Sequence, residues 1–270
     1  MGNDSGNSSG RNSGSNGSET ALVQQEKDGG IAFVRFVPSP PFDDRLVFWQ
    51  HGSSETAASY RLLRQRLIEH GDPRAVLCTT AVRSEGATTL ATNLALAFAE
   101  LGKYRVLLIE ASFRRASIAE LFGFKPPKGF ALQLARHRAQ PMEPWVVVQV
   151  GSAPLYVLAV EPRCCPHCQA VIALEALFCG MCGKDVAGSG TGSLDAMTFS
   201  TAIKRFRSAF DYIVVDAPPV LAGGDVNLIQ DTADAIVIAT RKGRSEARNL
   251  RRALSQVAPA PVAAVVLLDA

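Results

Sequence analysis

Short apolar runs, separated by longer amphipathic stretches, limit what this chain can fold into more than any other feature of its sequence. The clearest runs cover residues 75–79, 105–110, 212–216, 235–240 and 262–268. They lack the apolar–polar alternation of a half-exposed strand, so we expect strands that are buried on both faces. Such strands, with helices between them, predict an α/β fold with a mainly parallel β-sheet flanked by helices.

Helices are predicted where a capping signal precedes a longer stretch. Ser54 is a typical N-cap, and Glu55 suits the first turn of a helix that continues to about Glu69. Two short β-like runs, 31–36 and 46–49, are expected to form a small hairpin or edge strands. The other predicted elements are helices over 88–101, 194–210 and 245–257 and strands over 146–150 and 155–160.

Composition divides the chain into four parts. Residues 1–20 are almost all Gly, Ser, Asn and Asp. They cannot bury enough apolar surface to offset the entropy cost of ordering, so we expect a disordered tail. Residues 21–53 are interpreted as N-terminal strands and a linker, and 54–270 as the main domain. A cysteine-rich insertion is expected at 162–186 within that domain.

Net charge and hydropathy limit which partners and which cellular compartment we expect for this chain. The formal net charge is +3 over 270 residues, which favours neither a nucleic-acid nor a membrane partner. No apolar run reaches the ~18–20 residues that a bilayer-spanning helix needs, and no secretion-signal pattern is found. We therefore expect a cytoplasmic protein, where clustered cysteines serve as metal ligands more often than as disulfides.

Two CxxC pairs, with ten residues between them, form the sharpest local motif. Four thiolates at this spacing can surround Zn²⁺ tetrahedrally and leave no open position, so we expect a structural zinc ribbon. Two disulfides are the alternative interpretation, and the neighbouring Cys164 and His167 are further candidate ligands. The four expected ligands are Cys165, Cys168, Cys179 and Cys182.

Residues 75–101 place a strand, a loop and a helix in the order of a phosphate-binding P-loop. In a working loop, backbone N–H groups hold the phosphates, a lysine reaches the β- and γ-phosphates, and the next hydroxyl binds Mg²⁺. Here Thr88 has the Mg²⁺ position, but Ala87 replaces the lysine and Ser84 replaces a glycine. The candidate nucleotide-binding residues are Ser84, Glu85, Gly86, Ala87, Thr88 and Thr89.

Four segments resemble one known family. Segment 60–64 resembles the helix before its first strand, and 81–89 resembles its loop, AxPGEGKST. Segment 106–115, VLLIEASFRR, resembles its acidic motif VLLIDADLRRP, and 210–219, FDYIVVDAPP, resembles FDYVIIDTPP. On these grounds the chain resembles the bacterial tyrosine kinases (BY-kinases) of capsule and exopolysaccharide synthesis, within the MinD/ParA-like P-loop proteins. The resemblance implies ATP and Mg²⁺ as cofactors and protein tyrosine kinase activity.

The chain departs from that family where charge matters most. The two metal-handling aspartates of the acidic motif are Glu110 and Ser112 here, and the lysine is Ala87, whereas Asp216 of the last motif is kept. One unit charge about 4 Å from a phosphate oxygen is worth about 4 kcal/mol at an effective dielectric of about 20, or roughly 10³ in affinity. Glu110 and Asp216 are therefore interpreted as vestigial catalytic residues of a pseudoenzyme, and binding of ATP and Mg²⁺ is doubtful.

Three functions stay open at this point. The favoured one is a non-catalytic regulator or scaffold in exopolysaccharide or capsule biosynthesis, peripheral at the inner face of the membrane. By resemblance it would work with a membrane polysaccharide co-polymerase or an active kinase paralogue, or as a homo-oligomer. The second is an active tyrosine kinase or ATPase with a rearranged site, in which Lys103 or Lys242 replaces the missing charge. The third, a nucleic-acid-binding module that uses the zinc ribbon and the basic helix, is least favoured, because the ribbon has few basic residues, only Arg163 and Lys184 nearby. No aromatic residues interleave with the arginines of 244–252, which favours a solvated helix face there.

Overall fold

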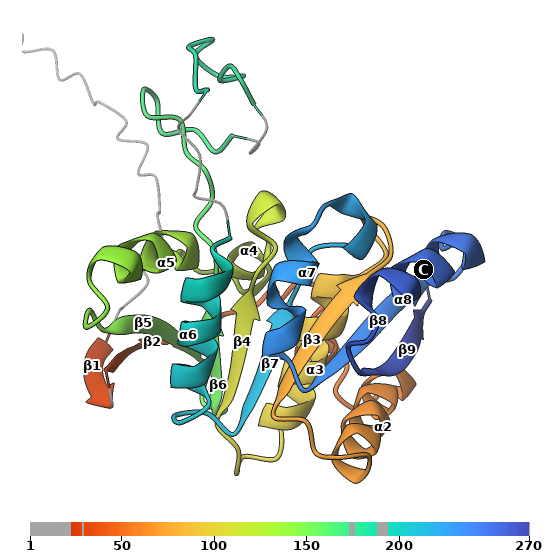
Figure 1. Cartoon of the computed structure of the whole chain (residues 1–270). Coiled ribbons are helices and arrows are strands. Elements are labelled where there is room, and N and C mark those ends of the chain that lie inside the picture. Colours follow the sequence, from red (N-terminus) through yellow and green to blue (C-terminus); the bar gives the residue numbers. More distant parts are fainter. Residues whose placement is uncertain (1–22, 29, 173–175, 188–193, 270) are drawn as a thin grey trace, which may run out of the picture.

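A mainly parallel sheet forms the centre of the protein (Figure 1). The computed structural model describes residues 23–28, 30–172, 176–187 and 194–269, so the expected tail at 1–20 lies outside the described residues. Within them, nine strands pair in the order β1-β2-β5-β6-β4-β7-β3-β8-β9. The strands are β1 Val23–Asp28, β2 Ile31–Phe36, β3 Ala75–Thr80, β4 Val106–Glu110, β5 Trp145–Val150, β6 Leu155–Leu158, β7 Tyr212–Asp216, β8 Ala235–Arg241 and β9 Val262–Leu268.

The expected fold class is confirmed by the strand pairing. Among the described strands, only the β1–β2 and β5–β6 pairs are antiparallel, and the other neighbouring pairs run parallel. β3, β4 and β7 are buried at every position, as their unbroken apolar runs predict. The carboxyl ends of these three central strands meet at one edge of the sheet, which is where parallel α/β sheets hold ligands.

Helices cover both faces of the sheet. Side chains alternate along each strand, so Leu77 packs into one apolar cluster and its neighbour Cys78 into the other. Helices α5 to α8 cover the first face, and α1 to α4 cover the second. The helices are α1 Val47–Gln50, α2 Glu55–Glu69, α3 Ala87–Ala99, α4 Ile118–Phe122, α5 Phe130–Ala139, α6 Ala196–Phe206, α7 Asp225–Ile229 and α8 Ala247–Val257.

The two short β-like runs near the N-terminus have different outcomes. Segment 31–36 is a strand as predicted, but it is no edge strand, because β2 lies between β1 and β5. The strand prediction for 46–49 is wrong, since this segment begins the short helix α1. The backbone N–H of Val47 donates to Asn93 Oδ1 of α3 at 3.0 Å, and Leu46 is buried. A tertiary contact therefore overrides the local β preference of this run.

Other predicted elements form with small changes at their ends. The Ser54 side chain accepts a hydrogen bond from the N–H of Ala57 at 3.2 Å and caps α2, which ends at Glu69 as expected. The helix expected at 194–210 is shorter and covers Ala196–Phe206. None of the helices in the described part of the chain is long and apolar enough to cross a membrane.

Candidate functional site

The loop between β3 and α3 keeps the backbone shape of a phosphate-binding turn. Gly86, the N-cap of α3, has a φ of 103°, and Ser84 has a φ of 65° although it carries a side chain. Among the described residues, the backbone N–H groups of Ala87, Thr88 and Thr89 have no acceptor. Together with the positive end of the α3 dipole, these free donors are suited to an anion.

Glu85 has a structural part in this loop. Its carboxylate is buried and accepts hydrogen bonds from the N–H of Val82, at 2.9 Å, and from the Ser245 hydroxyl. Ser245 in turn accepts from the N–H of Arg241 at 2.7 Å. The side chain of Glu85 thus ties the loop to the end of β8, whereas Ser84, Gly86, Ala87, Thr88 and Thr89 line the pocket beside it.

Gly86 offers a direct test of how tightly this loop is held. A Cβ added there would lie 2.4 Å from Leu268 Cδ1, at a φ of +103°. We expect Gly86→Ala to lower the free energy of unfolding by about 2–3 kcal/mol, measured by chemical denaturation. Gly102→Ala is the matched control, because Gly102 also has a positive φ, +70°, but a Cβ added there would meet no atom within 4 Å. We expect this control to lower the free energy of unfolding by about 1 kcal/mol. Equal losses in the two variants would contradict a close contact at Gly86.

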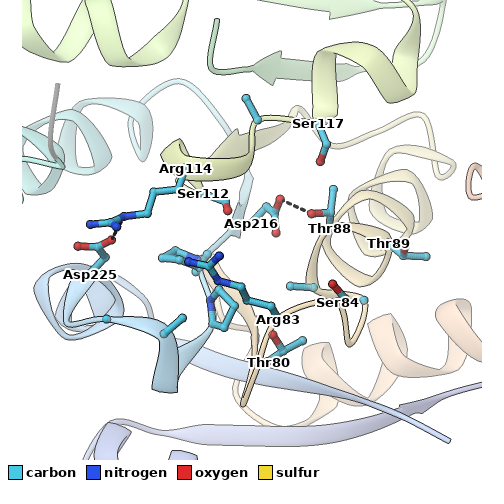
Figure 2. A pocket seen from close by; sticks show the side chains of 18 of the residues that line it. Thr80, Arg83, Ser84, Thr88, Thr89, Ser112, Arg114, Ser117, Asp216 and Asp225 are labelled. Carbon is cyan, nitrogen blue, oxygen red and sulfur yellow. Dashed lines mark hydrogen bonds and ion pairs between the residues drawn. The ribbon is translucent and has the colours of Figure 1, made fainter. Parts of the chain in front are cut away.

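Asp216, at the end of β7, lies in the same pocket (Figure 2). Its Oδ2 accepts a hydrogen bond from the Thr88 hydroxyl at 2.8 Å, while the buried Oδ1 has no partner among the described residues. Burial, and after it the nearby Glu110 carboxyl, raise the pKa of Asp216 to about 8, although the hydrogen bond from Thr88 lowers it. Thr88 and Asp216, the residues that would hold a metal ion in a P-loop enzyme, are therefore hydrogen-bonded to each other, and the Asp216 carboxyl is largely neutral.

Glu110 is the register partner of Asp216 on the neighbouring strand β4, but its side chain does not line the pocket. Its Oε1 accepts from the N–H groups of Ser117 and Ile118, at 2.5 and 3.0 Å, and its Oε2 accepts from Val160 at 2.8 Å. Burial raises the pKa of Glu110 to about 7 in spite of these three donors. The Glu110 carboxylate thus ties β4 to α4 and to the end of β6 and does not line the pocket.

The pocket has a volume of about 520 Å³ and contains arginines to which the sequence motifs assign no role. Four guanidinium groups line it, and two of them are paired: Arg45 with Asp43 at 2.7 Å and Arg114 with Asp225 at 3.8 Å. Arg83 stands inside the loop motif, so the sequence showed that it lies in the loop, but not that its side chain lines the pocket. Arg114 likewise stands in the motif segment 106–115, whereas Arg45 and Arg241 come from distant segments, and no local pattern points to them.

Neither lysine considered as a replacement for the missing charge lies in this pocket. Lys103 packs over the ring of Tyr104, with its Nζ 4.6 Å from the ring centroid. Lys242 forms an ion pair with Asp269 at 3.4 Å. The described part of the chain therefore brings arginines, and no lysine, to the loop.

The four cysteines of the insertion lie together as expected, and they could hold a metal ion. Their sulfur atoms are all within 4.8 Å of one another. Two of these distances are 3.7 Å, from Cys165 to Cys182, and 3.6 Å, from Cys168 to Cys179. A tetrahedron with Zn–S bonds of about 2.3 Å has edges of about 3.8 Å, whereas a disulfide needs about 2.05 Å. The geometry therefore fits a metal ion better than two disulfides.

Two similar turns hold these cysteines. The N–H of Cys165 donates to the carbonyl of Ala170 at 2.9 Å, and the N–H of Cys179 donates to Lys184 at 2.8 Å. In each turn the residue four places after the first cysteine has a positive φ: Gln169, at 61°, and Gly183, at 68°. Such paired turns aim thiols at one centre, as the CxxC spacing predicts.

The candidate ligands beside the motif have other surroundings. Among the described residues, Cys164 and His167 do not belong to the group of side chains that could share a metal ion. Cys164 Sγ lies 3.7 Å from the carbonyl of Pro162, and His167 is exposed and contributes its backbone N–H to Cys165 Sγ at 3.4 Å. In this segment, the described residues that could share a metal ion are thus Cys165, Cys168, Cys179 and Cys182.

Comparisons with known proteins find sequence similarity to bacterial tyrosine-protein kinases. No family model matches the chain. Tyrosine-protein kinase CpsD of Streptococcus pneumoniae serotype 4 is 27% identical over 199 residues, which cover 73% of this chain and 76% of that protein. Further similar proteins are also named tyrosine-protein kinases, among them YwqD of Bacillus subtilis and, as a putative one, EpsB of Ralstonia solanacearum.

Solved structures show the same fold. The kinase domain of the Escherichia coli tyrosine kinase Etk matches with a TM-score of 0.62 at 16% identity, over 83% of this chain and 79% of that one. MinD of Pyrococcus horikoshii, solved with Mg-ADP, matches with a TM-score of 0.51 at 15% identity, over 72% of this chain and 68% of that one. The fold and the loop together define a P-loop protein of the MinD/ParA type. Within that class, the sequence of the chain is similar to those of bacterial tyrosine-protein kinases such as CpsD and YwqD.

Proposed function

We propose that this chain is a non-catalytic protein of the bacterial tyrosine-kinase (BY-kinase) type, a regulator or scaffold in exopolysaccharide or capsule biosynthesis. The observation that carries the proposal is the loss of both charges needed for phosphoryl transfer from Mg·ATP. Ala87 supplies no cation, and Ser112 supplies no carboxylate. Glu110 is occupied by three backbone donors outside the pocket. Because phosphoryl transfer depends mainly on positioning and charge stabilisation, little catalysis should survive.

The partners that the family resemblance suggests are a membrane polysaccharide co-polymerase, an active kinase paralogue, or a further copy of this chain. Such a partner would hold the protein at the inner face of the membrane. The insertion at 162–186 offers an additional docking surface, because its large side chains Val171, Leu177, Phe178 and Met181 are exposed. A nucleic-acid role has less support, because Arg163, one of the few basic residues of the insertion, is not available to contact phosphates. Its guanidinium is buried and donates hydrogen bonds to the carbonyls of Ala176 and Val186.

The proposal is tested by turnover. We expect the purified protein to show no Mg²⁺-dependent ATP hydrolysis or tyrosine phosphorylation above the level of its own Asp216→Asn variant, with streptococcal CpsD as positive control. Robust turnover that is lost in Asp216→Asn would instead favour the alternative, an active kinase or ATPase with a rearranged site.

Restoring the lysine is the complementary test. Ala87 lines the pocket at the first turn of α3, so Ala87→Lys is expected to strengthen Mg·ATP binding at least tenfold, measured by calorimetry. Ala87→Met, which adds similar bulk without charge, is the control. Micromolar binding of Mg·ATP by the wild type, with no gain in Ala87→Lys, would contradict the role given to the missing charge.

A further inference from the structure

The pocket beside α3 carries unpaired positive charge. Among the described residues, Arg83 and Arg241 have no ion-pair partner and no side-chain hydrogen bond, whereas the other two lining arginines are paired. Figure 2 shows Arg83 extending from the loop into the open space below Asp216 and Ser112. Arg83 thus brings a guanidinium into the cavity that Ala87 also lines, and Ala87 stands where P-loop proteins carry their lysine.

Ligands for a divalent cation are scarce in the same cavity. Mg²⁺ requires about six oxygen ligands in near-octahedral geometry, usually with one or two carboxylates. Of the two lining carboxyls, Asp225 faces Arg114 at 3.8 Å, and Asp216 accepts the hydroxyl of Thr88 at 2.8 Å. The charge balance of the described pocket residues therefore favours an anion that arrives without a metal ion.

Donors for such an anion are already in place. The free N–H groups at the start of the thirteen-residue helix α3 face the loop that Ser84 and Gly86 shape. The Oδ1 atom of Asp216, which lines this cavity, is buried and has no hydrogen-bond partner among the described residues, so it is a polar atom that a ligand could satisfy. At about 520 Å³, the cavity is also within the range of small-molecule sites.

We propose that this pocket binds a polyphosphate-bearing anion without a divalent cation, and that Arg83 supplies the charge that Ala87 does not. The planar guanidinium can contact two phosphate oxygens through a fixed pair of parallel N–H groups, whereas a lysine ammonium acts as a point charge without that fixed geometry. The inference rests on the proposed non-catalytic function, because it gives the retained loop a ligand-sensing part in a protein without turnover. The ligand class is a nucleoside di- or triphosphate or a free polyphosphate, which share the same phosphate chemistry.

The test is titration calorimetry of the full chain with ADP and with inorganic pyrophosphate, in EDTA and in Mg²⁺. We expect binding in EDTA that Mg²⁺ does not strengthen, and a loss of at least tenfold in Arg83→Ala. Arg83→Lys should keep part of the affinity. Arg252→Ala, an exposed arginine on α8 outside this pocket, is the matched control and should bind as the wild type does. Thermal unfolding of each variant confirms that it is folded.

The outcomes separate this inference from the proposed function. ADP binding that exceeds pyrophosphate binding tenfold supports a nucleotide, and equal affinities support a free polyphosphate. Absence of binding to both probes at millimolar concentration, binding only with Mg²⁺, or binding unchanged in Arg83→Ala would overturn the inference. Mg²⁺-dependent ATP turnover would overturn the proposed function instead, whatever the result in EDTA.

Discussion

Removal of a bound metal ion is expected to unfold the insertion at 162–186 while the nine-stranded domain stays folded. Within the described part of the insertion, the buried apolar cluster consists of only Cys165, Cys179 and Val186. Ordering each residue costs about 1–2 kcal/mol of backbone entropy, which so small a cluster cannot offset. A structural Zn²⁺ contributes about 10–16 kcal/mol in small zinc modules. Metal analysis should find one zinc per chain, and hydrogen exchange should show protection of 176–187 only in the metal-loaded protein.

Substitution of single cysteines separates zinc from the alternatives. Cys168→Ser and Cys179→Ser should each reduce the zinc content strongly and lower the exchange protection of the insertion. Cys164→Ser is the matched control, because this thiol is adjacent in sequence but lies outside the group of four. It should keep one zinc per chain. A metal-free protein that contains two disulfides, or full zinc content in Cys179→Ser, would contradict the assignment.

Asp216→Asn is expected to make the protein more stable than the wild type at alkaline pH. The raised pKa of about 8, against 3.8 for an ordinary aspartate, means that only the folded state keeps the proton between about pH 4 and pH 8. Unfolding releases that proton, so the free energy of unfolding falls as the pH rises through this window. The shift sets an upper limit on the order of 5 kcal/mol, and we expect a gain of about 3 kcal/mol at pH 9.

Denaturation at several pH values measures this effect. The gain should shrink towards pH 5, where the wild-type carboxyl is protonated and resembles the amide. Glu110→Gln is the contrasting variant, because its amide would turn an N–H donor towards one of the three backbone donors that Glu110 accepts. That variant should lose about 1–3 kcal/mol. A gain in Asp216→Asn that is constant with pH would show that a buried charge is not its cause.

Local sequence patterns were sufficient to predict the strands that consist of unbroken apolar runs. The apolar runs of β3, β4, β7 and β8 predicted their strands, because burial on both faces tolerates few polar side chains. The run of β9 also forms a strand, but the expected burial on both faces is wrong there, since β9 lies at the edge of the sheet and none of its residues is buried. Strand β1, with the sequence VQQEKD, and helix α1 were not predicted. Their conformations depend on pairing with β2 and on contact with α3, which lie outside any local window.

The candidate site divides in the same way. The CxxC spacing was enough to predict the group of four cysteines, since short turns of fixed length leave few directions for the thiols. The substitution of the loop lysine by Ala87 was also plain from the motif. The inward turn of Glu110 and the unpaired charge of Arg83 in the pocket were not, because both depend on which donors and acceptors the packed chain brings near them.

By itself, the sequence determined the sheet, the loop and the missing lysine, because apolar runs, glycines and charges act over a few neighbouring residues. Only the tertiary structure decided which charges meet in the pocket. It places Arg45, Arg83, Arg114 and Arg241 around one cavity and turns Glu110 away from it. The physical reason is that electrostatic interactions depend on distance in space and on burial, and the packing of strands and helices sets both.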